Sequence, residues 1–177
     1  MGLTSGSTRP APTGFARLHG RVNRNVRLLE MHSAETMVKM LFNAFPQRVV
    51  RGIVAPHDCE ECSALRDQLT GVTWQDVPGD FVHANDGALP LLSHEAYVAF
   101  LPAWLRQAVL DPSGPAAGMV LINLHHKLDT IGFTRRQAKV IMEVARYVVH
   151  SGIWGPEDPG NVESLAEIER VWSSVAA

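Results

Sequence analysis

The chain has 177 residues, of which 46% are hydrophobic and 19% charged, and its formal net charge is −2. This composition is typical of one globular domain and excludes collagen, coiled coils and wholesale disorder. Two cysteines are too few for a disulfide framework, no run approaches the roughly 20 apolar residues of a membrane span, and no apolar signal core follows the N-terminus. We therefore expect a cytoplasmic protein that has no membrane partner.

Residues 1–30 differ in charge from the remainder of the chain. They contain five arginines and one acidic residue, Glu30, among Gly, Ser, Thr and Pro residues, and they show no sustained apolar period. We interpret this segment as a flexible basic arm, or as the product of a translation start placed too early, since Met31 directly precedes the first convincing helix. A targeting peptide is the weaker alternative. The helical domain is then expected to span residues 31–177.

The first predicted helix follows Ser33, a suitable N-cap, and ends before Pro46. Between these residues, apolar side chains recur at three- and four-residue spacings and line one helical face. Residues 49–54 are mostly β-branched and form the best strand candidate, but the run is too short to be distinguished from an extended connection. At most a minor strand element is therefore expected.

Asp58 and Glu61 are three residues apart, as in a capping box, and Gly71 is well placed as a C-terminal stop. These signals predict a helix over about 59–70. The following residues, 71–85, carry two aromatic side chains among Gly, Pro and Asp, which predicts a loop with short extended pieces.

Ser93 is the expected N-cap of the next helix, and a broad apolar stripe assigns this helix to the core. Tyr97 and Trp104 belong to the stripe and are interpreted as core residues rather than as a ligand site. Pro102 removes a backbone donor, so the helix is expected to kink there or to divide in two. Residues 119–128 form a further apolar segment whose type stays open.

Thr134 and Gln137 form a second capping box, which opens a long helix that runs to about His150 and ends at Gly152. A final amphipathic helix is predicted over about 162–175. Together these elements predict a mainly α fold: a single compact domain of about five helices with at most a minor strand element, preceded by the flexible arm.

The long predicted helix carries several basic residues, and Glu143 interrupts their series. We interpret this series as a solvated helix face. They are Arg135, Arg136, Lys139 and Arg146. Outside the arm, acidic residues outnumber basic ones, which argues against general nucleic-acid binding. Weak binding of nucleic acid by the arginine-rich arm is the one exception that we expect. Another protein is the expected partner, and the oligomeric state stays open.

The segment PHDCEEC contains the residues that best fit a metal site or a reactive thiol. It places the imidazole of His57 and the thiols of Cys59 and Cys62 within six residues, and Cys-x-x-Cys is the spacing with which two thiolates reach one tetrahedral zinc ion. The start of a helix also supplies free amides and a positive dipole end, which favour negatively charged sulfur at both cysteines. The fourth ligand is not identified. The candidates for that position are His83, His94, His125 and His126.

Three interpretations of these residues stay open. In the first, the cysteines are ordinary reduced side chains beside an unrelated histidine. In the second, His57, Cys59 and Cys62 hold a structural zinc ion. In the third, the thiols form a redox pair, with Cys59 as the nucleophile and Cys62 as the resolving thiol. Glu60 and Glu61 oppose thiolate formation, and the alternating strands and helices of a thioredoxin-like sheet are missing, which weakens the third interpretation.

The order HDCEEC, Trp74, LLSHEAYVAFLPAWL and GFTRRQAKVIMEVARYV resembles an uncharacterised family of small bacterial proteins. Its members show a His-x-Cys-x-Glu-Cys segment, then a tryptophan, an LLSxEAYxxFLPAxL helix and an FTxxQ helix. The match covers about residues 35–150. The positions that fit are His57, Cys59, Glu61, Cys62, Ser93, Glu95, Tyr97, Phe100, Leu101, Pro102, Thr134 and Gln137. The resemblance implies a mainly helical, cytoplasmic bacterial domain and a shared role for the histidine and the two cysteines, and it carries no assigned activity.

Two hypotheses about function follow. The leading one is a non-catalytic interaction or accessory protein, of the immunity type, whose HDCEEC segment is held by structural zinc at His57, Cys59 and Cys62. The alternative is a thiol redox protein that uses Cys59 and Cys62. A catalytic zinc ion is the least favoured, because Glu61 is the nearest candidate for a general base and already has a predicted capping role. An enzyme is thus the less favoured class.

Overall fold

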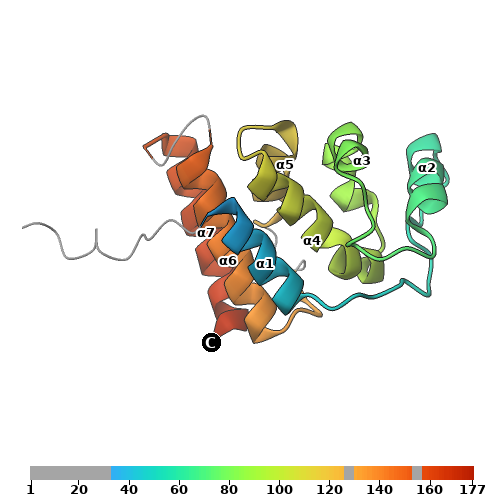
Figure 1. Cartoon of the computed structure of the whole chain (residues 1–177), viewed down its shortest axis with the longest axis horizontal. Helices are drawn as coiled ribbons and strands as arrows, with labels where there is room; N and C mark the ends of the chain where they lie inside the picture. Colours follow the sequence, from blue (N-terminus) through green and yellow to red (C-terminus); the bar gives the residue numbers. More distant parts are fainter. Residues whose placement is uncertain (1–32, 126–129, 153–156) are drawn as a thin grey trace, which may run out of the picture. The chain divides into compact units, whose positions relative to one another are not determined.

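The computed structural model describes residues 33–125, 130–152 and 157–177. The predicted arm, residues 1–30, lies outside these ranges. Figure 1 shows the helices, which follow along the chain as α1 (Ala34–Ala44), α2 (Glu60–Leu69), α3 (Gly79–Ala84), the short 3-10 helix η2 (Asp86–Leu91), α4 (His94–Leu110), α5 (Pro115–Asn123), α6 (Arg135–Ser151) and α7 (Pro159–Ala176).

The mainly α fold is confirmed. No strand occurs in the described part of the chain, and residues 49–54 form an irregular connection. Within the same ranges, no helix combines the length and the apolar character that crossing a membrane requires.

The five predicted long helices are all present, and three of them begin as the sequence indicates. The hydroxyl oxygens of Ser33 and Ser93 accept the backbone N–H three residues further on, at 3.2 and 3.3 Å. At the start of α6, Thr134 and Gln137 form both halves of the capping box. Local hydrogen bonds of this kind satisfy amides that the first helical turn leaves free, so they can be predicted from a few neighbouring residues.

One prediction for the middle of the chain is wrong, and one of two alternatives at Pro102 is excluded. Residues 71–85 are not a loop throughout, because they contain α3, which has no side-chain cap. The ring of Phe81 packs edge-on against that of Trp104 in α4 at 6.3 Å, so tertiary packing rather than local propensity stabilises this short helix. The predicted division of α4 at Pro102 does not occur. Pro102 is buried inside a continuous helix, where packing from several elements offsets its lost hydrogen bond.

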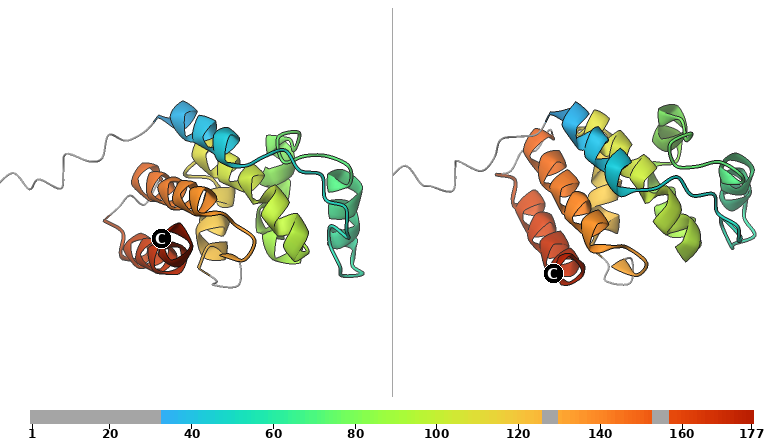
Figure 2. Two further views of the ribbon diagram at one scale, coloured as in Figure 1. Left: turned by 90° about the horizontal axis from the view of Figure 1, so that it is seen from below. Right: turned by 60° about the horizontal axis from the view of Figure 1, so that its bottom comes forward.

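Helix α4 is the centre of the packing, since it contacts α1, α3, η2, α5 and α6. Figure 2 shows α6 and α7 side by side with α1 next to α6, in agreement with their direct contacts. The ring of Phe133 joins these helices, because its centroid lies 6.3 Å from Phe45, 6.2 Å from Tyr97 and 5.2 Å from Trp172. The assignment of Tyr97 and Trp104 to the core is confirmed. The sequence left the structure of the apolar segment 119–128 open, and residues 119–123 of it belong to the helix α5.

Helix α2 has a different environment. It makes few contacts with other helices, and in Figure 1 it stands at the end of the row of helices, away from α6 and α7. Cys62, Leu65 and Leu69 form its buried side. The segment before it is fixed to α4 by the backbone hydrogen bond from Ser93 N–H to the carbonyl oxygen of Val54, at 2.8 Å. The fold thus presents the start of α2 at one end of the described helices.

Candidate dithiol site

The first turn of α2 is built around the sulfur of Cys59. Cys59 is the N-cap residue, and its Sγ accepts the backbone N–H of Cys62 at 3.4 Å. The predicted capping box of Asp58 and Glu61 is therefore wrong. The helix begins one residue later than that box requires, at Glu60, so Asp58 lies outside the helix and a thiol takes the place of its carboxylate.

The two cysteines differ in exposure. Cys59 is exposed, whereas Cys62 has an exposed fraction of 0% and belongs to the hydrophobic core. Both are free thiols. An exposed cysteine at the helix start is therefore followed, one turn later, by a buried cysteine. This difference in exposure distinguishes an attacking thiol from a resolving thiol.

The pKa of the Cys62 thiol is raised. The main cause is a hydrogen bond with the side chain of Cys59, followed by burial and by the charge of Cys59. A backbone hydrogen bond with His57 and the positive charge of Arg66 act in the opposite direction. The expectation that the helix start favours a thiolate at both cysteines is thus wrong for Cys62, because burial and the neighbouring sulfur outweigh the helix dipole.

Arg66 holds the segment before α2 in place. Its guanidinium donates to the carbonyl oxygens of Ala55 and His57, at 2.9 and 2.8 Å. Sequence reasoning missed this residue. The available signal was its position seven residues after Cys59, which places both residues on one side of the helix, two turns apart. The contact puts a positive charge close to the buried thiol and fixes the backbone of His57 beside it.

The structure brings together Cys59 and Cys62, but it does not gather a third metal-ligating side chain with them. His57 is exposed, and within the described ranges no group of three or more His, Cys, Asp or Glu side chains is arranged to hold a metal ion. Of the candidates for a fourth ligand, His83 is hydrogen-bonded to Gln107 at 2.8 Å. His126 lies outside the described residues. The zinc set of His57, Cys59 and Cys62 stays a prediction.

A cavity of about 310 Å³ adjoins the dithiol segment. We call it the α2 cavity. Its lining comes from Glu61 and Leu65 of α2 and from residues 84–91. The complete lining is Glu61, Leu65, Ala84, Asn85, Asp86, Gly87, Ala88 and Leu91. Glu61 stands between the two cysteines in the sequence, and neither cysteine is among the residues that line the cavity.

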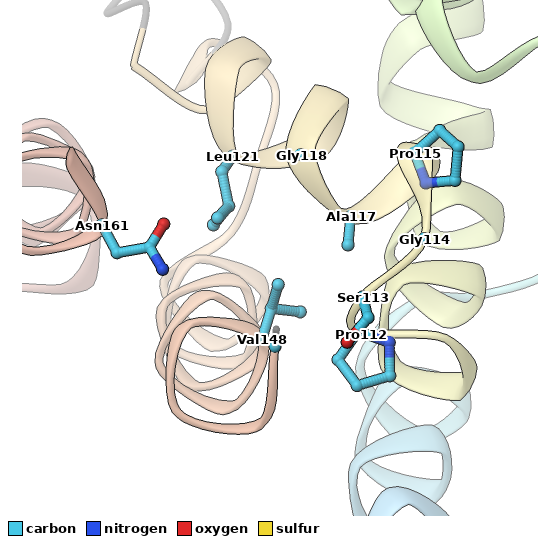
Figure 3. Close-up of a pocket in the computed structure, with 10 residues that line it drawn as sticks. Pro112, Ser113, Gly114, Pro115, Ala117, Gly118, Leu121, Val148 and Asn161 are labelled. Carbon is cyan, nitrogen blue, oxygen red and sulfur yellow. The ribbon is translucent and has the colours of Figure 1, made fainter. Parts of the chain in front are cut away.

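A second cavity, of about 350 Å³, lies between the loop before α5 and the helices α5, α6 and α7. Figure 3 shows Leu121 and Val148 on its apolar walls, with the amide of Asn161 at one side and Pro115 at the other. None of its lining residues carries a titratable side chain or a thiol. The dithiol segment is therefore a stronger candidate site than this second cavity.

Comparisons with protein-family models, with curated proteins and with solved structures each give no match for this chain.

Proposed function

We propose that the protein is a thiol–disulfide exchange protein that uses Cys59 and Cys62. The observation that carries this proposal is the first turn of α2, where the sulfur of an exposed N-cap cysteine accepts the backbone N–H of Cys62 at 3.4 Å, and the thiol of Cys62 is fully buried. Such a pair needs no further residue to exchange with a disulfide, since the reaction takes place between sulfur atoms.

The exchange has two steps. The Cys59 thiolate attacks one sulfur of a substrate disulfide, the S–S bond breaks, and the leaving thiolate takes a proton from water. The Cys62 thiol then loses its proton to water and attacks the sulfur of Cys59, which releases the second substrate thiolate. The substrate disulfide gains two electrons and two protons to give two thiols, and Cys59 and Cys62 become an internal disulfide. A second thiol compound must reduce this disulfide before the next cycle.

The surroundings of Cys62 favour this order of events. In the resting state, the Cys59 side chain raises the pKa of Cys62 through its hydrogen bond and its charge. When Cys59 enters a mixed disulfide, it carries no negative charge, so both effects weaken. The positive charge of Arg66, which lowers the pKa of Cys62, stays in place. The resolving thiolate thus forms more readily once it is needed.

The test uses the full chain, which is convenient because it contains only two cysteines. Reduced protein is mixed with the neutral compound hydroxyethyl disulfide, and the products are identified by mass spectrometry. We expect the wild type to give the internal disulfide, Cys62→Ser to accumulate the mixed disulfide, and Cys59→Ser to give neither at a comparable rate. The matched control is Ser63→Ala, an exposed neighbour that is expected to behave like the wild type.

A zinc-stabilised interaction protein is the second candidate. Cys59 and Cys62, one helical turn apart, supply two of the four ligands that structural zinc uses, and His57 lies two residues before the first of them. Metal content and thiol number, measured on protein purified without a histidine tag, separate the candidates. About one zinc ion per chain, both thiols recovered after chelation, and a clear loss of thermal stability in the double variant Cys59→Ser and Cys62→Ser would support zinc and contradict exchange.

A further inference from the structure

The backbone directly before the dithiol segment is packed and hydrogen-bonded, although it belongs to no helix. We call residues 54–57 the strap. Its first residue, Val54, accepts the backbone N–H of Ser93 at 2.8 Å, which ties the strap to the start of α4. Val54 and Ala55 have exposed fractions of 2% and 0%. The first half of the strap therefore belongs to the core.

Arg66 of α2 holds the other half of the strap with one nitrogen atom. Its Nη1 donates to the carbonyl oxygens of Ala55 and His57, at 2.9 and 2.8 Å. Two carbonyl groups that accept from the same atom must both point toward it. The guanidinium thus fixes the direction of the backbone between Ala55 and His57, and we call these two hydrogen bonds the Arg66 clamp.

The Arg66 clamp lies next to the buried thiol. Cys62 and Arg66 are four residues apart in α2, so their side chains are neighbours on one side of the helix. The pKa of Cys62 is raised, chiefly by the hydrogen bond with Cys59, and the two causes that act downward are a backbone hydrogen bond with His57 and the charge of Arg66. The two residues that the clamp joins are therefore the same two that stabilise a negative sulfur at Cys62.

We infer that Arg66 is a positioning residue for the resolving step of the exchange. This inference rests on the proposed exchange function. The clamp keeps the backbone of His57 and the guanidinium itself beside the Cys62 sulfur while that sulfur attacks Cys59. The first step does not use the clamp, because Cys59 is exposed and meets the substrate disulfide from solvent.

The resolving step explains why the two steps differ. The Cys62 thiol gives its proton to water, its sulfur bonds to the sulfur of Cys59, and the bond between Cys59 and the substrate sulfur breaks. The leaving thiolate takes a proton from water, so no further oxidant or reductant is needed. Negative charge passes through a fully buried sulfur in this step, where fixed donors have a larger effect than in water.

The experiment measures the two steps separately. The reduced full chain is mixed with hydroxyethyl disulfide at several concentrations, the reaction is stopped with acid at successive times, and the species are quantified by mass spectrometry. Formation of the mixed disulfide depends on the concentration and gives the first rate constant. Its conversion into the internal disulfide does not, and gives the second.

For Arg66→Gln, we expect the second rate constant to fall about tenfold and the first to stay within about twofold of the wild type. Arg66→Lys keeps the charge and a nitrogen that can donate to both carbonyl oxygens, so its second rate constant should fall only about threefold. Arg170→Gln is the matched control. It removes a mainly exposed arginine from α7, and both of its rate constants are expected to equal those of the wild type.

The outcomes separate this inference from the exchange function. A merely structural role would loosen the strap and expose Cys62, which leaves the second rate constant unchanged or raises it. That result, or an equal fall of both rate constants, would overturn the inference and leave the exchange function intact. If circular dichroism shows that Arg66→Gln is unfolded, Arg66→Lys is judged by the same comparison of the two steps. If the wild type forms neither disulfide, the exchange function is wrong and the inference fails with it.

Discussion

The bundle of α1, α4, α6 and α7 and the segment around α2 are held together in different ways. In the bundle, apolar faces meet along whole helices, and indole rings such as that of Trp172 fill the space between them. Around α2, much of the order comes from hydrogen bonds between side chains and backbone, those of Cys59 and Arg66 above all. Bundle packing is spread over many residues, whereas the α2 segment depends on a few. Such segments open at a lower free energy than the core, which suits the proposed exchange with a disulfide.

The largest expected effect of a single change lies in the bundle. Trp172→Ala removes a fully buried ring that contacts Phe133 and donates from Nε1 to the carbonyl oxygen of Leu124 at 2.9 Å. We expect it to lower the free energy of unfolding by about 3–5 kcal/mol. Urea unfolding followed by circular dichroism measures this. A loss below about 1 kcal/mol would show that the bundle does not depend on this packing.

A medium effect is expected for Arg66→Gln. The shorter side chain cannot reach the carbonyl oxygens of Ala55 and His57, one of which belongs to a fully buried residue, and we expect a loss of about 1–2 kcal/mol. Hydrogen exchange should become faster at residues 55–62 while α6 keeps its protection. Arg170→Gln is the control, because this arginine is mainly exposed and its pair with Glu167 is expected to contribute less than about 1 kcal/mol. Equal acceleration throughout the chain would contradict the local role of Arg66.

A smaller effect is expected at the N-cap of α2. Cys59→Ala removes the acceptor for the N–H of Cys62 and should cost about 0.5 kcal/mol, because sulfur is a weak acceptor and the site is exposed. Cys59→Ser keeps a capping atom and should retain or exceed the stability of the wild type, although it is expected to abolish the proposed exchange. Chemical unfolding of both variants thus separates capping from reactivity. An alanine variant as stable as the wild type would show that the sulfur does not act as a cap.

The smallest effect concerns pH. The pKa of Cys62 is raised in the folded chain above its ordinary value of 9.0, chiefly by the hydrogen bond with Cys59, so folding favours the protonated thiol. The resulting stabilisation is complete below pH 9.0 and is lost as the pH rises through the higher folded pKa. We expect the Tm to fall more steeply above pH 9.0 for the wild type than for Cys62→Ala. Parallel curves would contradict the assignment.

The same contrast explains what could be predicted from the sequence. The start of α1 at Ser33 and the capping box of α6 depend on residues three positions apart, so the pattern alone was sufficient. The helix α3 is stabilised by Phe81 against Trp104, which is 23 positions away, and no local signal contains that contact. The cap of α2 was misplaced because an aspartate is the commoner N-cap residue, and the structure uses the following cysteine instead.

The candidate site was predicted in part for the same reason. Cys59 and Cys62 meet because they are one helical turn apart, so their spacing was informative. Their difference in exposure depends on which side of α2 faces the core, and the role of Arg66 depends on the path of the chain before the helix. The α2 cavity is lined by residues of α2 and by residues 84–91, which begin 15 positions after the end of α2. Sequence periodicity does not predict a contact between segments that far apart.

The packing of α1 against α6 has a consequence for synthesis of the chain. The two helices are neighbours in space, yet about 90 residues separate the end of α1 from the start of α6. At about 5–20 residues per second, a ribosome needs roughly 5–20 s to add those residues, and the tunnel delays their release further. The part of α1 that packs against α6 therefore stays uncovered by α6 while translation of the intervening residues continues.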